Sequence, residues 1–118
     1  MTSDCYPCRM WARLDDLPPR ERVAVHGGWR IAHAFDTSLP GWLCVLPRRH
    51  ITSLAELNGD EARTLGPLLA AGSAALQQVL ACEKTYAMLF AEREGFAHLH
   101  FHLVPRMVDF DAAVEARL

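Results

Sequence analysis

Apolar and polar positions in the first half of the chain follow a pattern that predicts three β-strands. Residues 23–26, the turn signal Gly27-Gly28 and residues 29–35 together have the pattern of a β-hairpin. A short and strongly apolar run at residues 42–46 has the composition of a buried strand, and we expect Pro47 to end it.

Beyond residue 57 the apolar period changes from two to that of a helix. Asn58 is a suitable N-cap, and Glu61 stands three residues later, as in a capping box. The dipeptide Gly66-Pro67 interrupts the pattern, and we expect a kink or a break there because proline in a helix interior costs roughly 3 kcal/mol. A stripe at helical spacing is expected to face the core; it contains Leu65, Leu68, Leu69, Gly72, Leu76, Val79 and Leu80.

Two further strands are predicted near the end of the chain, at residues 85–91 and 98–104, with Pro105 ending the second. The order is strands, one long helix, then strands, without βαβ alternation. This order predicts an α+β domain built on an antiparallel sheet of about five strands, with the runs at 42–46 and 98–104 in the centre. Residues beyond Asp109 are expected to form a short helix or a loose tail.

Composition places the chain among globular proteins. It is 51% hydrophobic and 22% charged, which argues against disorder. A length of 118 residues is enough for one domain with a core that needs no disulfides. We therefore expect a single domain over residues 1–118, with an N-terminal segment at 1–20 and a C-terminal tail at 109–118.

Charge and hydropathy narrow the possible partners. The net charge of −2 provides no basic field for nucleic acid, so a small anionic substrate is expected rather than a polyanion. No apolar run approaches the roughly 20 residues that span a membrane. The first five residues lack the features of a signal peptide, so cytoplasmic localisation is expected. In a reducing compartment Cys5-x-x-Cys8 indicates a metal or redox pair, whereas Cys44 and Cys82 have the setting of buried small apolar residues.

Three histidines at alternate positions carry the clearest chemical signal. On a strand His98, His100 and His102 share one face, and three imidazoles in register are hard to explain as packing. Two uses are open. The three rings could hold a catalytic zinc with a bound water, or one ring could be a nucleophile that attacks phosphorus while its neighbours bind the phosphate and protonate the leaving group. Spacing alone does not decide between them.

These histidines belong to a longer pattern. His98-Leu99-His100-Phe101-His102-Leu103-Val104, followed by Pro105-Arg106, resembles the defining motif of the histidine-triad (HIT) superfamily. A second block also resembles that superfamily; it runs from Ala34-Phe35-Asp36 through Pro40-Gly41-Trp42-Leu43-Cys44-Val45-Leu46-Pro47 to Arg48-Arg49-His50. The resemblance extends from Cys5 to Arg106 and implies a HIT-like fold.

What the resemblance implies can be placed on individual residues. His100 would be the nucleophile of a covalent nucleotidyl-enzyme intermediate, with the backbone carbonyl of His98 orienting its ring. His102 would contact the α-phosphate of a small nucleotide substrate and help the leaving group. Asp36 matches the position that holds the ribose, although a turn residue that caps its own backbone is an alternative reading. A homodimer formed through the long helix and a sheet edge is also implied.

The resemblance also implies a role for the cysteine pair. Cys5 and Cys8 match a zinc pair of many bacterial HIT proteins, in which the set is completed by the residues that correspond to His50 and His98. A Cys2His2 set is closed and tetrahedral, and therefore structural. The resemblance thus implies one structural zinc, which leaves His100 and His102 for chemistry.

One segment departs from the family pattern. Where many members carry Gly-Gln-Ser/Thr, this chain has Arg93-Glu94-Gly95. The hydroxyl is absent and Glu94 would repel a phosphate unless it is protonated or paired, for which Arg93 is the candidate. Phosphate binding is then expected to involve Arg93, backbone N–H groups or Arg106. The departure keeps open a nucleotide-binding module with little turnover beside the leading hypothesis of a nucleotidyl hydrolase or transferase acting on phosphoramidates or dinucleoside polyphosphates.

Three aromatic side chains are candidates for a wall that stacks on the base. Trp29, Trp42 and Phe90 could stack on it, but at strand spacing such residues are more often part of the core.

Overall fold

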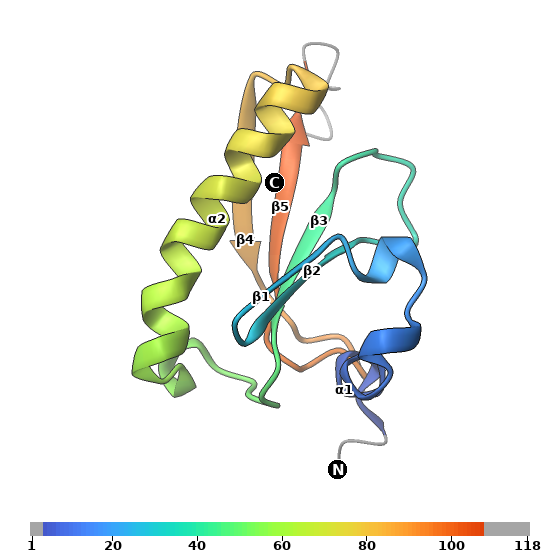
Figure 1. Ribbon diagram of the computed structural model, residues 1–118, viewed down its shortest axis with the longest axis vertical. Helices are drawn as coiled ribbons and strands as arrows, with labels where there is room; N and C mark the ends of the chain where they lie inside the picture. The colour runs from blue at the N-terminus through green and yellow to red at the C-terminus, as the bar shows by residue number, and fades with distance from the viewer. Residues whose placement is uncertain (1–3, 108–118) are drawn as a thin grey trace.

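A five-stranded antiparallel sheet forms the centre of the computed structural model, which describes residues 4–107 (Figure 1). The strands lie in the order β1-β2-β3-β5-β4. Their bounds are β1 Ala24–His26, β2 Trp29–His33, β3 Leu43–Pro47, β4 Lys84–Leu89 and β5 Phe101–Arg106. The helices are α1 Tyr6–Ala12 and α2 Gly59–Leu80, with 3-10 turns at Leu14–Asp16, Pro19–Glu21 and Leu54–Glu56. The predicted α+β class, antiparallel sheet and central position of β3 and β5 are confirmed.

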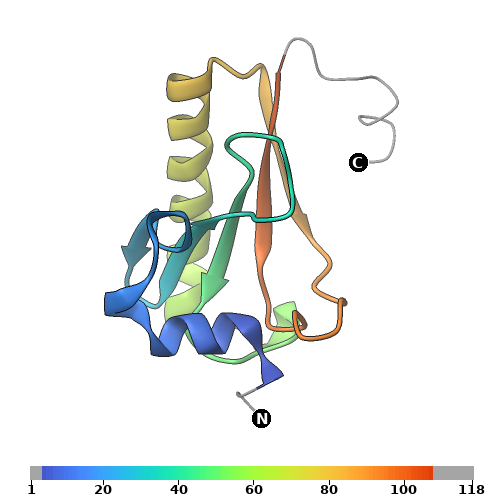
Figure 2. The same cartoon turned by 90° about the vertical axis from the view of Figure 1, so that its right-hand side faces the viewer.

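Side chains of the sheet separate into two sets by alternation along the strands. One set packs against α2 and forms the core; it contains Trp29, Ile31, Leu43, Val45, Leu99, Phe101 and Leu103, with Leu76 from the helix. The alternate residues, among them Arg30, Cys44 and His102, line a cavity instead. Because neighbouring strand residues point to opposite faces, the core and the cavity lie on opposite faces of the same sheet. Figure 2 shows α2 standing along one of these faces.

The predicted capping box begins α2, but the helix does not break at Pro67. Asn58 accepts from the Glu61 N–H at 2.8 Å, and the Glu61 carboxylate accepts from the Asn58 N–H at 2.9 Å. The helix continues through Gly66 and Pro67, so the predicted kink or break was not found as an interruption. Both residues are exposed, so water can reach the carbonyl that loses its bond, and Gly66 has no Cβ to collide with the proline ring.

One member of the predicted core stripe of α2 is not in the core. Val79 is 79% exposed, whereas Gly72 and Leu76 are buried and the other leucines of the stripe are partly buried against the core. Val79 lies in the last turn of the helix and points away from the core.

The last two strands differ in their bounds from the prediction. β5 includes Pro105, which pairs with Thr85 of β4. The Arg106 carbonyl accepts from the Glu83 N–H, so Pro105 directs its backbone toward the β3 side, where the pairing has already ended at Leu103. The absence of an N–H group in Pro105 therefore removes no hydrogen bond between the strands. His98 to His100 lie in the segment that enters the strand rather than within it.

Among the described residues, no helix has both the length and the apolar character needed to cross a bilayer. The expected C-terminal helix or tail from Asp109 onward, like the first three residues, lies outside the part of the chain that the structure describes.

Gly41 lies in the loop before β3, and its backbone packs against the end of α2. Its φ of +87° disfavours any residue with a Cβ, and a Cβ there would overlap Leu80 Cδ1 and lie 3.1 Å from Leu76 Cδ2. We predict that Gly41→Ala lowers the free energy of unfolding by at least about 2 kcal/mol, measured by urea denaturation. Gly28→Ala is the matched control, because a Cβ at Gly28 meets nothing within 4 Å. Equal stability of the two variants would contradict the packing described.

Candidate active site and metal centre

His98 is the residue around which the site is organised. Its ring is fully buried, and its Nδ1 lies 3.4 Å from the sulfurs of both Cys5 and Cys8. Its Nε2 lies 2.7 Å from the carbonyl oxygen of Pro47. A carbonyl only accepts, so Nε2 carries the proton and the Nδ1 lone pair faces the two sulfurs. This is the tautomer that a metal-binding histidine requires.

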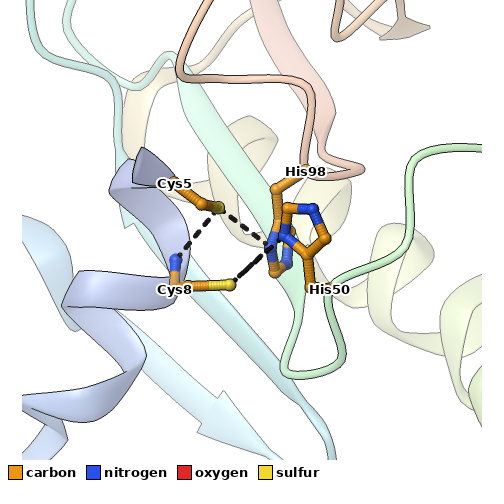
Figure 3. A group of neighbouring side chains, drawn as sticks. All are labelled: Cys5, Cys8, His50 and His98. Carbon is orange, nitrogen blue, oxygen red and sulfur yellow. Dashed lines mark hydrogen bonds between the residues drawn. The ribbon is translucent and has the colours of Figure 1, made fainter. Parts of the chain in front are cut away.

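The start of α1 brings the two cysteines together. Cys5 is the N-cap, and its sulfur accepts from the backbone N–H of Cys8 at 3.4 Å, so both sulfurs lie at the same end of the helix (Figure 3). His50, in the loop after β3, places its Nδ1 3.3 Å from the Cys8 sulfur. The predicted set Cys5, Cys8, His50 and His98 is therefore assembled, with all ligand atoms within 4.8 Å of one another.

Three sulfur–nitrogen separations in the cluster fit zinc. Tetrahedral zinc with ordinary Zn–S and Zn–N bonds sets sulfur and nitrogen about 3.5 Å apart, close to the separations found here. Burial and the neighbouring Cys5 raise the pKa of the Cys8 thiol to about 11, so the cluster without a cation retains protons. A bound dication stabilises both thiolates. The donor set, its geometry and the tautomer of His98 agree in supporting a structural zinc.

A cavity of about 480 Å³ opens on the other face of the sheet from α2. Its walls come from β2, β3 and β5, from the start of α1, and from the loops around residues 34–37 and 90–96. Three aromatic rings pack against one another at its side: Tyr6 with Phe35 at 5.3 Å between centroids, and Phe96 with both. The cavity therefore combines a mostly apolar wall with three histidines: His33 from β2, and His100 and His102 from the triad.

The ring of His100 is held by the backbone of His98. Its Nδ1 lies 2.9 Å from the His98 carbonyl oxygen, so Nδ1 carries the proton and Nε2 keeps the lone pair. The arrangement predicted from the resemblance is thus present. One residue serves both sites: the side chain of His98 belongs to the metal cluster while its carbonyl orients His100.

His102, the other triad histidine at the cavity, has the opposite tautomer. The indole N–H of Trp42 donates to His102 Nδ1 at 2.9 Å, with the two rings nearly perpendicular. His102 therefore carries its proton on Nε2. Burial, and in smaller part the nearby His100, lower the pKa of His102 to about 4. The two rings lie 4.9 Å apart between centroids, one with a lone pair on Nε2 and the other with a donor there.

A buried ion pair forms part of the cavity wall, and sequence reasoning missed it. Arg30 and Glu21 are both almost fully buried, with Arg30 Nη1 3.2 Å from Glu21 Oε1, and the Tyr6 hydroxyl donates to Glu21 Oε2 at 2.7 Å. In the sequence Arg30 occupies an alternating polar position that is typical of a solvent-facing strand side. The polar and apolar alternation along β2 predicts correctly which face of the sheet Arg30 is on. It does not indicate that α1 and the 3-10 turn at Pro19–Glu21 cover that face.

The predicted substrate residues do not all lie at the cavity. Asp36, with a φ of +60°, and Arg93 line it. Glu94 and Arg106 are not among its lining residues, and Glu94 is exposed. Arg93 lies over the Phe96 ring at 5.2 Å, and the ion pairs between described residues do not include Arg93 with Glu94.

The three candidate aromatic residues divide between core and cavity. Trp29 is in the core, 1% exposed, whereas Trp42 and Phe90 line the cavity. Of the remaining cysteines, Cys82 is buried as expected, and Cys44 is a half-buried wall residue whose thiol pKa is raised to about 11 by burial.

No protein-family model and no curated protein matches the chain by sequence. Solved structures match it by shape. A HIT family protein from Bacillus subtilis has a TM-score of 0.75 at 20% identity, covering 91% of this chain and 76% of that one. A zinc-bound histidine-triad family protein from Mycobacterium smegmatis has a TM-score of 0.75 at 15% identity, covering 95% and 83%. The chain has the histidine-triad fold.

The HIT fold explains the arrangement of the site. A third match, a hypothetical histidine-triad nucleotide-binding protein from Sulfolobus tokodaii, has a TM-score of 0.74 at 18% identity, covering 92% and 74%. The predicted HIT-like architecture is confirmed, and in this chain the fold places the triad where β5 meets both the metal cluster and the cavity.

The metal cluster predicts one zinc per chain. Cys8→Ser removes one of four ligands and should abolish stoichiometric zinc, measured by elemental analysis of the purified protein, and lower Tm by roughly 10 °C or more. Cys44→Ser is the matched control, because Cys44 is not a member of the cluster, and it should retain the metal. Zinc in full amount in Cys8→Ser would show that the cluster is not the metal site.

The lowered pKa of His102 predicts a pH dependence of stability. The folded protein takes up this proton near pH 4, whereas the unfolded chain takes it up near pH 6.5. The unfolded state thus binds more protons in this interval, and the free energy of unfolding falls as the pH is lowered from about 6.5 to about 4. His102→Gln lacks this contribution, so its stability should fall less steeply over the same interval. The substitution changes none of the four residues of the metal cluster, and parallel curves would refute the assignment.

Proposed function

We propose that this protein is a nucleotidyl hydrolase or transferase that works through a covalent nucleotidyl-histidine at His100. The observation that carries the proposal is the fixed tautomer of His100, whose Nδ1–H is held by the His98 carbonyl at 2.9 Å. A neutral imidazole with a free Nε2 lone pair beside a cavity has the form of a nucleophile.

The proposed reaction has two displacements at the α-phosphorus. His100 Nε2 attacks, the bond from phosphorus to the leaving group breaks, and the positive charge that develops on the ring is stabilised by the bond from Nδ1–H to the His98 carbonyl. His102, with its proton on Nε2, is placed to donate a hydrogen bond to a phosphate oxygen. Water or another acceptor then displaces His100 and releases the nucleotide.

The cavity suits a nucleotide in size and lining. Its volume lies within the roughly 300–1,000 Å³ of small-molecule sites. The cluster of Tyr6, Phe35 and Phe96 provides apolar and aromatic surface for a base, and Asp36 at the wall provides a carboxylate for ribose hydroxyls. Arg93 is the lining cation that we assign to the phosphates. Glu94 and Arg106 stand outside this wall, and we give them no direct phosphate contact.

A zinc held by all three triad histidines is not favoured. His98 directs Nδ1 toward the cysteines and Nε2 toward Pro47, so its ring has no nitrogen left for a cavity metal. Structural zinc in the cysteine cluster contributes no chemistry to the displacement. It supports the reaction by fixing the backbone of His98.

The proposal includes a homodimer and a cytoplasmic location. β4 is an edge strand with pairing on one side only, and the exposed Val79 lies in the last turn of the helix before it. This edge and helix suit the homodimer that the resemblance implies. The four free cysteines suit a reducing cytoplasm.

Trapping the intermediate tests the proposal directly. Zinc-loaded wild type and His100→Ala are mixed with adenosine and guanosine phosphoramidates and dinucleoside polyphosphates, quenched without acid and weighed by intact-protein mass spectrometry. We expect a nucleotidyl adduct on wild type that is absent in His100→Ala, and a loss of turnover of at least about 10³-fold.

The controls separate catalysis from binding. His26→Ala alters an exposed histidine of β1 and should keep the adduct. Brief treatment with a chelator should leave the initial rate unchanged. Nucleotide binding by folded, zinc-loaded protein with neither adduct nor turnover would instead establish the alternative, a nucleotide-binding module with little turnover, which the Arg93-Glu94-Gly95 segment favours.

A further inference from the structure

The hydrogen bond from Trp42 limits what His102 can do. An indole N–H donates and cannot accept, so the 2.9 Å bond makes His102 Nδ1 an acceptor and places its only proton on Nε2. A proton on both nitrogens would bring the Nδ1–H against the indole N–H. Protonation of His102 to the imidazolium therefore requires this bond to break.

A neutral histidine of this kind is a good hydrogen-bond donor and a very poor acid. General acid catalysis by histidine uses the imidazolium, which returns to the neutral ring when it gives up its proton. Loss of the Nε2 proton from neutral His102 would leave an imidazolate. The pKa of His102, lowered to about 4 by burial and by His100, agrees with a ring that stays neutral near pH 7.

Among the described residues, the two titratable side chains that contact His102 do not supply a proton relay. Cys44 places its sulfur 3.7 Å from Nδ1, but that lone pair is already occupied by the indole, and burial raises the thiol pKa to about 11. His100 has its one proton committed to the His98 carbonyl. Farther along the cavity wall, Glu21 is bound by Arg30 and by the Tyr6 hydroxyl.

We propose that the site acts on nucleotide conjugates whose leaving group departs as a stable oxyanion, such as dinucleoside polyphosphates and mixed phosphate anhydrides, and discriminates against phosphoramidates and alkyl phosphodiesters. This inference rests on the proposed nucleotidyl-histidine reaction and selects one substrate class within it. Trp42 is the positioning residue responsible.

The bond changes of the first step are balanced without a proton from the enzyme. His100 Nε2 forms a bond to the α-phosphorus, and the bond from phosphorus to the bridging oxygen breaks with its electron pair. A polyphosphate leaves as an oxyanion stable in water. An amine or alkoxide must be protonated as it leaves, and His102 cannot supply that proton. In the second step water displaces His100, and its proton passes to solvent.

Leaving-group dependence tests the inference. Wild type is assayed at neutral pH with adenosine 5′-aryl phosphodiesters ranging from p-nitrophenyl to phenyl, and with diadenosine triphosphate and adenosine 5′-phosphoramidate. We expect kcat/KM to fall steeply as the leaving group becomes more basic, with the triphosphate favoured over the phosphoramidate by at least about 10²-fold, the usual contribution of a general acid. A flat dependence, or a preferred phosphoramidate, would overturn the inference.

A spectroscopic measurement separates this role of Trp42 from a merely structural one. Nitrogen chemical shifts of ¹⁵N-histidine-labelled protein, assigned with His102→Asn, should show His102 with its proton on Nε2. In Trp42→Phe the ring should titrate closer to the ordinary histidine range, and the leaving-group dependence should become shallower below that pKa. Cys44→Ala should keep the wild-type dependence, and a steeper one would identify the thiol as the proton donor and overturn the inference.

The two proposals fail differently. If no conjugate gives an adduct or turnover, the proposed function is refuted, and this inference is refuted as well. Turnover that is insensitive to the leaving group, or a wild-type spectrum with the His102 proton on Nδ1, overturns the inference alone and leaves the nucleotidyl-histidine intact.

Discussion

Three hydrogen-bonding groups of His98 hold the site together. Its Nδ1 faces the cysteine sulfurs, its Nε2–H donates to the Pro47 carbonyl, and its own carbonyl receives the Nδ1–H of His100. The ring is completely buried, so each of these contacts replaces one that water would have made. The metal cluster and the orientation of the proposed nucleophile therefore depend on the same residue.

Several parts of this arrangement could be predicted from the sequence, because they depend on local rules. The capping box at Asn58, the hairpin turn at Gly27-Gly28 and the alternation that places His100 and His102 on one face all follow from short-range geometry. The zinc cluster was identified through resemblance, since spacing alone could not bring His50 next to Cys8. The predictions for Val79 and Pro105 are wrong: Val79 is exposed, and β5 continues through Pro105, where its pairing with β3 has already ended.

The polar half of the cavity could not be predicted, and the reason is physical. The Arg30–Glu21 pair is buried by α1 and a 3-10 turn, which are short elements with weak sequence signals. The bond between Trp42 and His102 joins residues 60 positions apart, and in the sequence Trp42 is one apolar residue among several. Tautomers are set by such long-range partners, so the division between a nucleophile and a donor becomes visible only in three dimensions.

The pleat of the sheet has a consequence for how this protein can diverge. On one face of β2, β3 and β5 the core residues pack with α2, and on the other face Arg30, Ala32, Cys44, Leu46 and His102 line the cavity. Substitutions on the two faces are therefore largely independent, the first acting on folding and the second on recognition. A lineage of such proteins can acquire new ligand preferences through the cavity-facing positions of β2 and β3 while its scaffold, and the register that carries His100, are inherited unchanged.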